Sequence, residues 1–291
     1  MFIQFLANGI VEGAVFGLIA LGFSIIYNTS KIFHFAYGAV YTFSAYAFFT
    51  FFILFKIHWL LSLLIALFLT ILLGMLIENF IYYPLFERKA SLKVAIISSI
   101  GAYIVIVNFI SMIFGNEIKI LRPGVEKTYE IGNVILTRIQ ILEFFVFLIL
   151  SLFTIYLLRF TKYGQALRAL ADNMQLAAVL GLSVKKLRLL SFGYGSFLCG
   201  VGSILVALDI GMDPWVGATA VLISAVAVIV GGVGIFESAI FGGVTLGIIQ
   251  NLAVWQISAR WESAITFLIL LFILIFRPQG IMGKRKRIEE L

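Results

Sequence analysis

Few side chains that could do acid–base or metal chemistry lie in or near the apolar stretches of this sequence. They are Glu12, Glu78, Asn108, Glu237, Asn251, His34 and His58. None of these glutamates has a second acid or a histidine at helical spacing, so the pattern does not indicate a proton relay. Glu78 and Glu237 fall near the ends of predicted spans, where we expect them to reach water. Glu12, about two turns from a span end, can do likewise.

Enzyme chemistry is not indicated either. The two histidines are too isolated for a metal site or a catalytic dyad, and Cys199 is the only cysteine, which we interpret as a small packing residue. The sequence contains no G-x-x-x-x-G-K-[ST] phosphate loop, so any ATP that drives this protein must be bound by a partner. We therefore expect no catalytic residue, no metal and no cofactor.

The composition requires a membrane. A chain of 291 residues that is 62% hydrophobic and only 12% charged cannot cover a soluble domain with polar surface. A spanning helix takes about 20 apolar residues, which leaves room for roughly eight to ten spans. The net charge of +7 is spread over loops, so it indicates orientation in the bilayer rather than nucleic-acid binding. We predict a single all-α polytopic membrane domain over residues 1–291.

The apolar stretches predict nine spans, with short re-entrant or broken segments. They cover residues 5–27, 35–55, 59–80, 92–114, 141–159, 188–208, 214–232, 236–256 and 262–277. With the C-terminus in the cytoplasm, fifteen lysines and arginines fall inside and six outside, as the positive-inside rule requires. Loop 115–140 is then external and the basic segment 160–187 cytoplasmic. A re-entrant segment at 28–38 would move only the N-terminus to the other side.

Small residues recur at every fourth position in two predicted spans. They are Gly9, Gly13 and Gly17 in the first, and Ala239, Gly243 and Gly247 in the eighth. Helices in lipid approach closely where small residues line one stripe. These stripes predict helix-packing seams in preference to a direct substrate contact.

Two polar or proline-containing breaks interrupt the helical pattern, one at 28–38 and one at 209–218. Discontinuous helices at corresponding positions of two halves point to a transport site. The predicted topology places the two breaks on opposite sides, as inverted halves would require. The candidate pathway residues are therefore His34, Tyr37, Gly38, Asp213 and Pro214. Ordinary loops at the membrane surface are the alternative interpretation.

The cytoplasmic segment predicts two short helices, over 164–171 and about 173–180. Asp172, with a glutamine three residues later, resembles a capping box for the second helix. Gly181 suits the position after its end, and Ser183 is expected to cap the next span. The second helix is too apolar to lie bare in water, so it must pack on the spans, lie in the interface or enter a groove on another protein.

The external loop contains two short apolar runs, 129–131 and 134–136, around Gly132-Asn133. This pattern predicts a β-hairpin with a two-residue turn. An isolated hairpin is marginally stable, so we expect it to lean on the spans or on a partner. A plain connector and a docking surface are both open at this point.

Several stretches together resemble the branched-chain amino acid permease family of bacterial and archaeal ABC importers, the LivH-like membrane subunits. The matching stretches are Asn8-Gly9 through Ala20-Leu21-Gly22; Phe35-Ala36-x-Gly38; TKYGQALRA at 161–169 with Asp172-Asn173; Ala177-Ala178 with Gly181; Gly231-Gly232-x-Gly234 with Gly242-Gly243; and Arg277-Pro278-Gln279-Gly280. Where the family commonly has Asn-Phe-Ala-His-Gly, this chain reads HFAYG at 34–38, and Glu12 stands at a usually uncharged position. The substrate therefore follows less directly than the family.

The resemblance implies a permease subunit in a prokaryotic inner membrane. A second homologous permease, two cytoplasmic ATPase subunits and an extracytoplasmic binding protein would be its partners. The coupling segment would be centred on Asn173, Ala177, Ala178 and Gly181. Leucine, isoleucine and valine are the implied substrates, with urea and short amides as the alternative within the family. A secondary transporter coupled to an ion gradient, with Glu12 as its acid, is the competing class.

Overall fold

Helices make up nearly all of the computed structural model, which describes residues 1–121, 127–132 and 134–283. The helices are α1 (Phe2–Ser30), α2 (Tyr37–Phe49), α3 (Trp59–Ile77), α4 (Tyr83–Glu87), α5 (Leu92–Phe114), α6 (Arg138–Phe160), α7 (Lys162–Asp172), α8 (Met174–Val179), α9 (Val184–Asp209), α10 (Val216–Gly231), α11 (Ser238–Gln256) and α12 (Glu262–Phe276). Two π-helical turns extend longer helices: η1 (Thr50–Leu54) continues α2, and η2 (Glu78–Tyr82) continues α3. The 3-10 turn η3 (Ala259–Trp261) precedes α12.

Each predicted span coincides with one of these helices. Seven helices of the described part are long and apolar enough to cross a membrane, when η1, η2 and α4 are counted with the helices they extend. The other two, α10 and α12, have 16 and 15 residues. At 1.5 Å per residue they are only about 22–24 Å long, less than the roughly 30 Å of a bilayer core. The prediction of an all-α polytopic membrane protein is confirmed.

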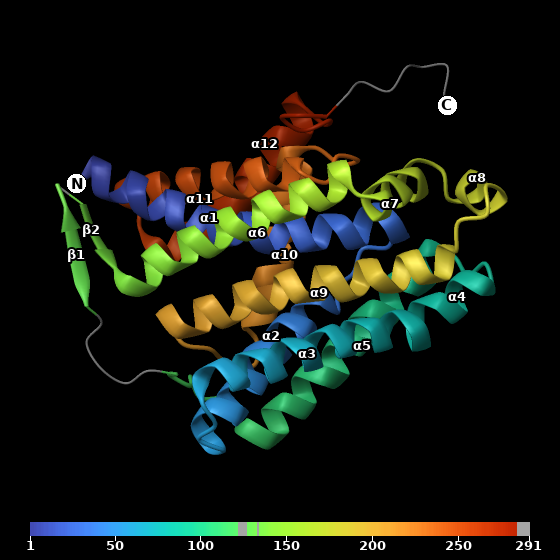
Figure 1. The fold of residues 1–291 in the computed structure, drawn as a ribbon. Coiled ribbons are helices and arrows are strands. Elements are labelled where there is room, and N and C mark those ends of the chain that lie inside the picture. Colours follow the sequence, from blue (N-terminus) through green and yellow to red (C-terminus); the bar gives the residue numbers. More distant parts are fainter. Residues whose placement is uncertain (122–126, 133, 284–291) are drawn as a thin grey trace.

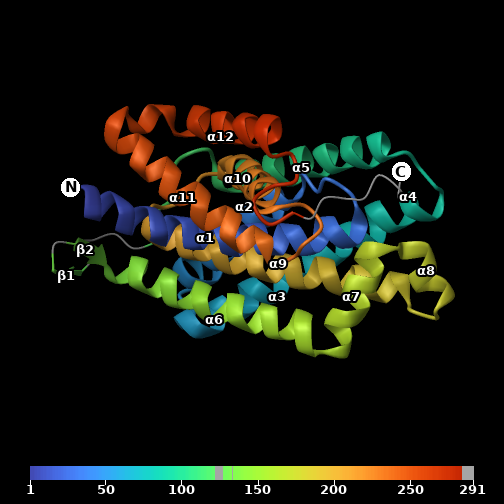
Figure 2. The same ribbon diagram turned by 90° about the horizontal axis from the view of Figure 1, so that it is seen from above.

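The two ends of the bundle differ (Figure 1). The N-terminus lies beside strands β1 (Thr128–Ile131) and β2 (Val134–Thr137) at one end, called the hairpin end below. Helices α7 and α8 lie at the opposite end, called the α8 end. Seen from above, α1 runs through the middle of the bundle, with α6 along one flank and α5 and α12 along the other (Figure 2).

Helix α1 is the centre of the core. Nine-tenths of its apolar window is buried, whereas less than a third is buried in α5 and α6. One hydrophobic cluster packs on the face of Ile19 and Phe23, and another on the face of Leu18 and Leu21. A helix that is apolar on every side belongs in such an interior position. The exposed apolar faces of α5 and α6 are free for lipid or for another membrane subunit.

The two glycine stripes pack against each other. A methyl group on Gly9 would lie 2.9 Å from the Cα atom of Ile248, and one on Gly13 would lie 2.8 Å from the Cα atom of Val244. Methyl groups on Gly243 and Gly247 would overlap the backbone at Gly17 and Gly13, respectively. Helices α1 and α11 therefore touch backbone to backbone, and only glycine permits that distance.

The predicted hairpin is confirmed. Strands β1 and β2 are antiparallel, with Ile131 opposite Val134. The side chain of Gln4 donates to the carbonyl of Ile135 and accepts from its N–H, both at 2.8 Å. The hairpin therefore leans on α1, as its marginal stability requires. Asn133 of the predicted turn lies outside the described residues.

Of two capping predictions in segment 160–187, one is wrong and the other is right in position only. The cap of α8 is Asn173, whose side chain accepts from the N–H of Leu176 at 2.9 Å, while Asp172 is the last residue of α7. Ser183 stands at the cap position of α9, but its hydroxyl makes no capping hydrogen bond. Gly181 has φ +82°, the left-handed conformation expected of a residue that ends a helix.

Candidate functional site

The first break folds back into the bundle. Helix α1 ends at Ser30, and Lys31 takes the left-handed conformation at φ 57°. The chain then returns alongside α1, because the hydroxyl of Tyr37 donates to the carbonyl of Ile19 at 2.7 Å, well before the end of α1. His34 on the returning segment is fully buried. This geometry is that of a re-entrant segment rather than of a loop on the surface.

The second break starts from the other end. Helix α9 ends at Asp209, at the hairpin end of the bundle (Figure 1). Met212 forms a two-bond backbone bridge with Lys119. Two residues later the carbonyl of Pro214 accepts from the hydroxyl of Thr42 on α2, at 3.3 Å. The carboxylate of Asp213 accepts from the N–H of Trp215 at 2.8 Å and so shapes the turn into α10.

The two breaks meet where α2 and α10 begin. A methyl group on Gly38 would overlap the carbonyl oxygen of Gly217, and one on Gly217 would overlap the carbonyl oxygen of Gly38. The first turns of the two helices therefore touch at a pair of glycines that leaves no room for a side chain. We call this contact the glycine junction. It brings together Tyr37, Gly38 and Pro214 of the candidate pathway residues.

His34 lies one step from the junction, in a chain of hydrogen bonds. Its Nδ1 atom is 2.8 Å from the hydroxyl of Tyr82, which donates to Ser99 at 2.7 Å. The hydroxyl of Ser99 also accepts from the N–H of Ala36 at 3.0 Å. The buried imidazole of His34 has no counter-charge among these partners. Its Nε2 atom has no hydrogen-bond partner among the described residues.

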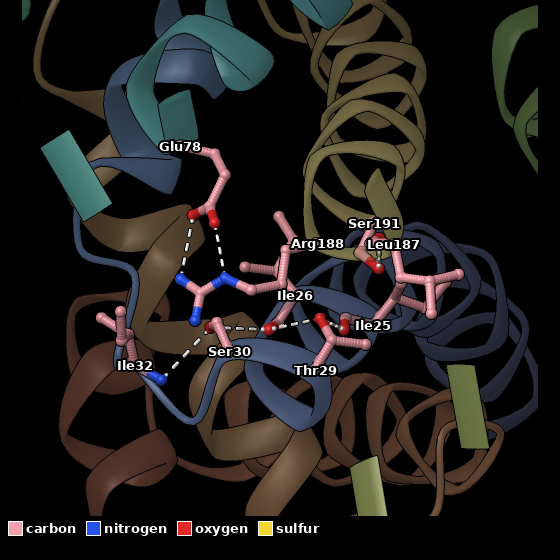
Figure 3. Close-up of polar contacts among 9 residues, drawn as sticks. All are labelled: Ile25, Ile26, Thr29, Ser30, Ile32, Glu78, Leu187, Arg188 and Ser191. Carbon is pink, nitrogen blue, oxygen red and sulfur yellow. Dashed lines mark hydrogen bonds and ion pairs between the residues drawn. The ribbon is translucent and has the colours of Figure 1, made fainter. Parts of the chain in front are cut away.

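A buried ion pair joins η2 to α9 (Figure 3). The Nε atom of Arg188 donates to one carboxylate oxygen of Glu78 at 2.6 Å, and its Nη2 atom donates to the other oxygen at 3.2 Å. Both side chains are 1% exposed, so the expectation that Glu78 reaches water is wrong. A carboxylate inside an apolar span needs a partner, but nothing in the local sequence points to a residue 110 positions away.

The second glutamate expected at a span end behaves differently. Glu237 lies 2.9 Å from Arg159, whose side chain is mostly exposed, at the end of α6. This pair lies at the surface of the α8 end, in agreement with the expectation that Glu237 reaches water. The ion pair connects the end of α6 to the turn before α11.

Glu78 and Tyr82 are the two ends of the π-helical turn η2. Arg188 holds the first from α9, and His34 binds the second from the first break. Short π-helical turns in longer helices often mark functional sites. Segment 160–187 leads directly into α9, which carries Arg188. A continuous series of covalent bonds, hydrogen bonds and the ion pair therefore connects α8, through Glu78 and Tyr82, to the glycine junction.

The four predicted coupling residues lie on and around α8. Asn173 caps the helix, Ala177 is buried against the bundle, and Ala178 and Gly181 are exposed. Three large apolar side chains of this short helix face outward. They are Leu176, Val179 and Leu180, and Val179 is 83% exposed. We call them the α8 patch. Large apolar side chains gathered at one exposed point are unusual on a surface that meets water alone.

Comparisons with known proteins agree over nearly the whole chain. The family model described as "Branched-chain amino acid transport system / permease component" matches residues 5–274. The permease LivH of Salmonella typhimurium is 27% identical over 97% of this chain and 96% of that protein. The permease BraD of Pseudomonas aeruginosa is 29% identical over the same shares. The probable permease LivH of Methanocaldococcus jannaschii is 28% identical over 94% of this chain and 92% of that protein.

A solved structure shares the fold. A chain of PsaBC from Streptococcus pneumoniae in complex with Fab superposes with a TM-score of 0.52 and 13% identity, and the match covers 95% of this chain and 93% of that chain. At this identity the likeness concerns the fold alone. The family match, in contrast, spans the glycine stripes, both breaks and the α8 patch. The chain is thus a multi-pass membrane protein that belongs to the permease component family of branched-chain amino acid transport systems.

Proposed function

We propose that this chain is the membrane-spanning permease subunit of an ABC importer for branched-chain and other hydrophobic amino acids. The α8 patch carries the proposal, because Leu176, Val179 and Leu180 present an apolar face at the end of the bundle remote from the hairpin. The sequence has no phosphate loop, so ATP would be bound by separate ATPase subunits that dock on this patch. The names of the relatives support the substrate class.

The proposal places the α8 end in the cytoplasm. Basic residues gather around α7 and the start of α9, among them Lys162, Arg168, Lys185 and Lys186. The positive-inside rule favours this side for the cytoplasm of a prokaryotic cell. The hairpin end would then face the extracytoplasmic binding protein. A second, homologous permease would pack on one of the exposed apolar faces.

Coupling would use the bonded route from α8 to the first break. ATP binding would change the fit of the ATPase pair on the α8 patch and move the start of α9. Arg188 would transmit this displacement to Glu78, and η2 would pass it through Tyr82 to His34. The glycine junction beside Tyr37 is packed too tightly to deform smoothly, so it would switch between two arrangements.

Single cysteines test both the docking and the orientation. Cys199 is buried, and Cys199→Ser removes it as a background thiol. We expect Val179→Cys to cross-link to an ATPase subunit in native membranes. We also expect this thiol to react with impermeant maleimide only in inverted vesicles.

The matched control is Ile135→Cys, on the exposed strand β2. It should be labelled from outside in whole cells and should give no ATPase cross-link. The reverse labelling pattern would refute the orientation. Full uptake by this chain in proteoliposomes without any ATPase would favour the ion-coupled alternative.

A further inference from the structure

An acidic cavity of about 340 Å³ occupies the half of the bundle nearest the hairpin end. Its walls are the first half of α1, Tyr41 of α2, the first turns of α6, α10 and α12, and the last turns of α9 and α11. This volume lies within the usual range for small-molecule sites, about 300–1,000 Å³. The cavity reaches Ile19, whose carbonyl binds the hydroxyl of Tyr37 beside the glycine junction.

Every charged side chain among the described residues that line this cavity is acidic. Its carboxylates are Glu12, Glu143, Asp209 and Glu262, and no lysine, arginine or histidine is among the described residues that line it. Glu12 accepts a hydrogen bond from the side chain of Asn251. Low-dielectric walls with charge of one sign focus the potential and attract ions of the other sign. The cavity is therefore built to attract a cation.

Glu143 is the carboxylate that most needs a ligand. It is only 4% exposed, it lines the cavity, and no hydrogen bond or ion pair joins it to any described residue. An isolated carboxylate in an apolar environment is costly unless a counter-charge reaches it. Glu78 shows that this protein can supply an arginine to a buried carboxylate. No such partner reaches Glu143 from the described residues, so the position is open to a cation from solution.

The shape of the site favours an organic cation over a metal ion. Among the described residues, no three histidine, cysteine or acidic side chains converge closely enough to hold a metal. Apolar side chains also line the cavity, among them Val15, Phe16, Ile19, Val216 and Ile223. A ligand that fits has a positive head and an aliphatic body.

We infer that the acidic cavity binds an alkylammonium group, with the ammonium on Glu143 and the aliphatic body against the apolar walls. The inference rests on the proposed import function only for the identity of the solute, a branched-chain amino acid on its way through the subunit. A monocationic amine of the same shape has the same head and body. The two sources differ in the carboxylate group of the amino acid, which Glu12, Glu143 and Glu262 would repel.

Three probes separate the parts of the ligand. Leucine carries the ammonium, the carboxylate and the branched chain; isopentylamine lacks the carboxylate; 4-methylpentanoate lacks the ammonium. Binding of each radiolabelled probe to the purified full-length chain in nanodiscs is measured by equilibrium dialysis, without ATP. We expect isopentylamine to bind and 4-methylpentanoate not to bind. Leucine binding assigns the site to the transported amino acid, and binding of isopentylamine alone assigns it to monocations.

The decisive variant is Glu143→Gln, which keeps the shape and removes the charge. Loss of a charge-assisted hydrogen bond should weaken binding of isopentylamine by about tenfold or more. Thermal unfolding of the same sample shows that the variant is folded. Glu130→Gln is the matched control, since Glu130 is exposed on strand β1 at the same end of the bundle.

Three results would overturn the inference: wild-type affinity in Glu143→Gln, binding of 4-methylpentanoate as tight as that of isopentylamine, or no binding of either amine-bearing probe. The binding assay uses neither ATP nor a partner subunit. Its failure is thus distinguishable from failure of the proposed import function, which is read from the cross-linking and uptake experiments.

Discussion

Glu78 and Glu143 are two equally buried glutamates with opposite surroundings. Glu78, near the α8 end, has both oxygens bound by Arg188. Glu143, toward the hairpin end, faces a cavity and has no partner among the described residues. The difference separates two uses of buried charge. One carboxylate is part of the connection between helices, and the other is available to a ligand.

The same substitution should therefore have very different effects on stability at the two positions. Breaking a buried pair leaves one uncompensated charge and is strongly destabilising, whereas replacing a whole pair by apolar side chains is often neutral. A carboxylate without a partner loses nothing when it is removed. This contrast orders the effects expected from the largest to the smallest.

Glu78→Leu should have the largest effect. It leaves Arg188 buried and unpaired, so we expect the free energy of unfolding to fall by about 3–5 kcal/mol. Denaturant unfolding in detergent micelles measures it. The double variant Glu78→Leu/Arg188→Met should recover most of the loss. If Glu78→Leu were as stable as the wild type, the ion pair would not contribute to the free energy of unfolding.

Tyr82→Phe tests the connection from the ion pair to the first break. Removing the hydroxyl leaves the Nδ1 atom of His34 without its partner, which should cost about 1–3 kcal/mol. The same unfolding assay applies. Tyr129→Phe, on the exposed strand β1, is the matched control and should change nothing measurable. Equal stability of both variants would argue against a bonded route through η2.

Gly181→Trp changes the residue that directly follows the α8 patch. Position 181 has open space around it but φ +82°, so a tryptophan there costs about 1–2 kcal/mol of local strain and reshapes the end of α8. We expect the protein to reach the membrane, with ATP hydrolysis by the assembled importer uncoupled from leucine uptake. Gly101→Trp, at an equally open position in α5, should stay coupled. Normal coupling in Gly181→Trp would contradict the docking model.

Glu143→Leu should have the smallest effect on stability. With no partner to lose, we expect a change within about 0.5 kcal/mol, or a small gain. The measurement is the same unfolding curve, run beside Glu78→Leu. A loss as large as that of Glu78→Leu would mean that Glu143 has a structural partner, and the contrast between the two glutamates would fail.

Local pattern was sufficient for much of the fold. Nine apolar stretches predicted nine helices at the right places, because twenty successive apolar residues can satisfy their backbone in lipid only as a helix. Gly181 was identified as a helix end from its type alone. The cap of α8 was misassigned by one residue, since Asp172 and Asn173 both suit that role and only the backbone conformation separates them.

Local sequence patterns predicted less of the surroundings of the buried glutamates than of the fold. Glu143 was not among the membrane-embedded residues singled out in the sequence, because it stands in the first turns of its span, where an acid usually reaches water. In the folded bundle, six other helices line the same cavity, and Glu143 is buried among them. Glu78 was singled out but misjudged for the same reason.

The sequence by itself determined which stretches form the long apolar helices, which of them carry glycine stripes, and where the helical pattern breaks. These are local properties, because hydropathy, glycine spacing and helix breakers act within one or two turns. The tertiary structure alone decided that Gly38 meets Gly217, that Arg188 neutralises Glu78, and that Glu143 is left facing a cavity. Each of these depends on which helices become neighbours, and a buried charge or a bare backbone acquires its role only from what lies across the interface.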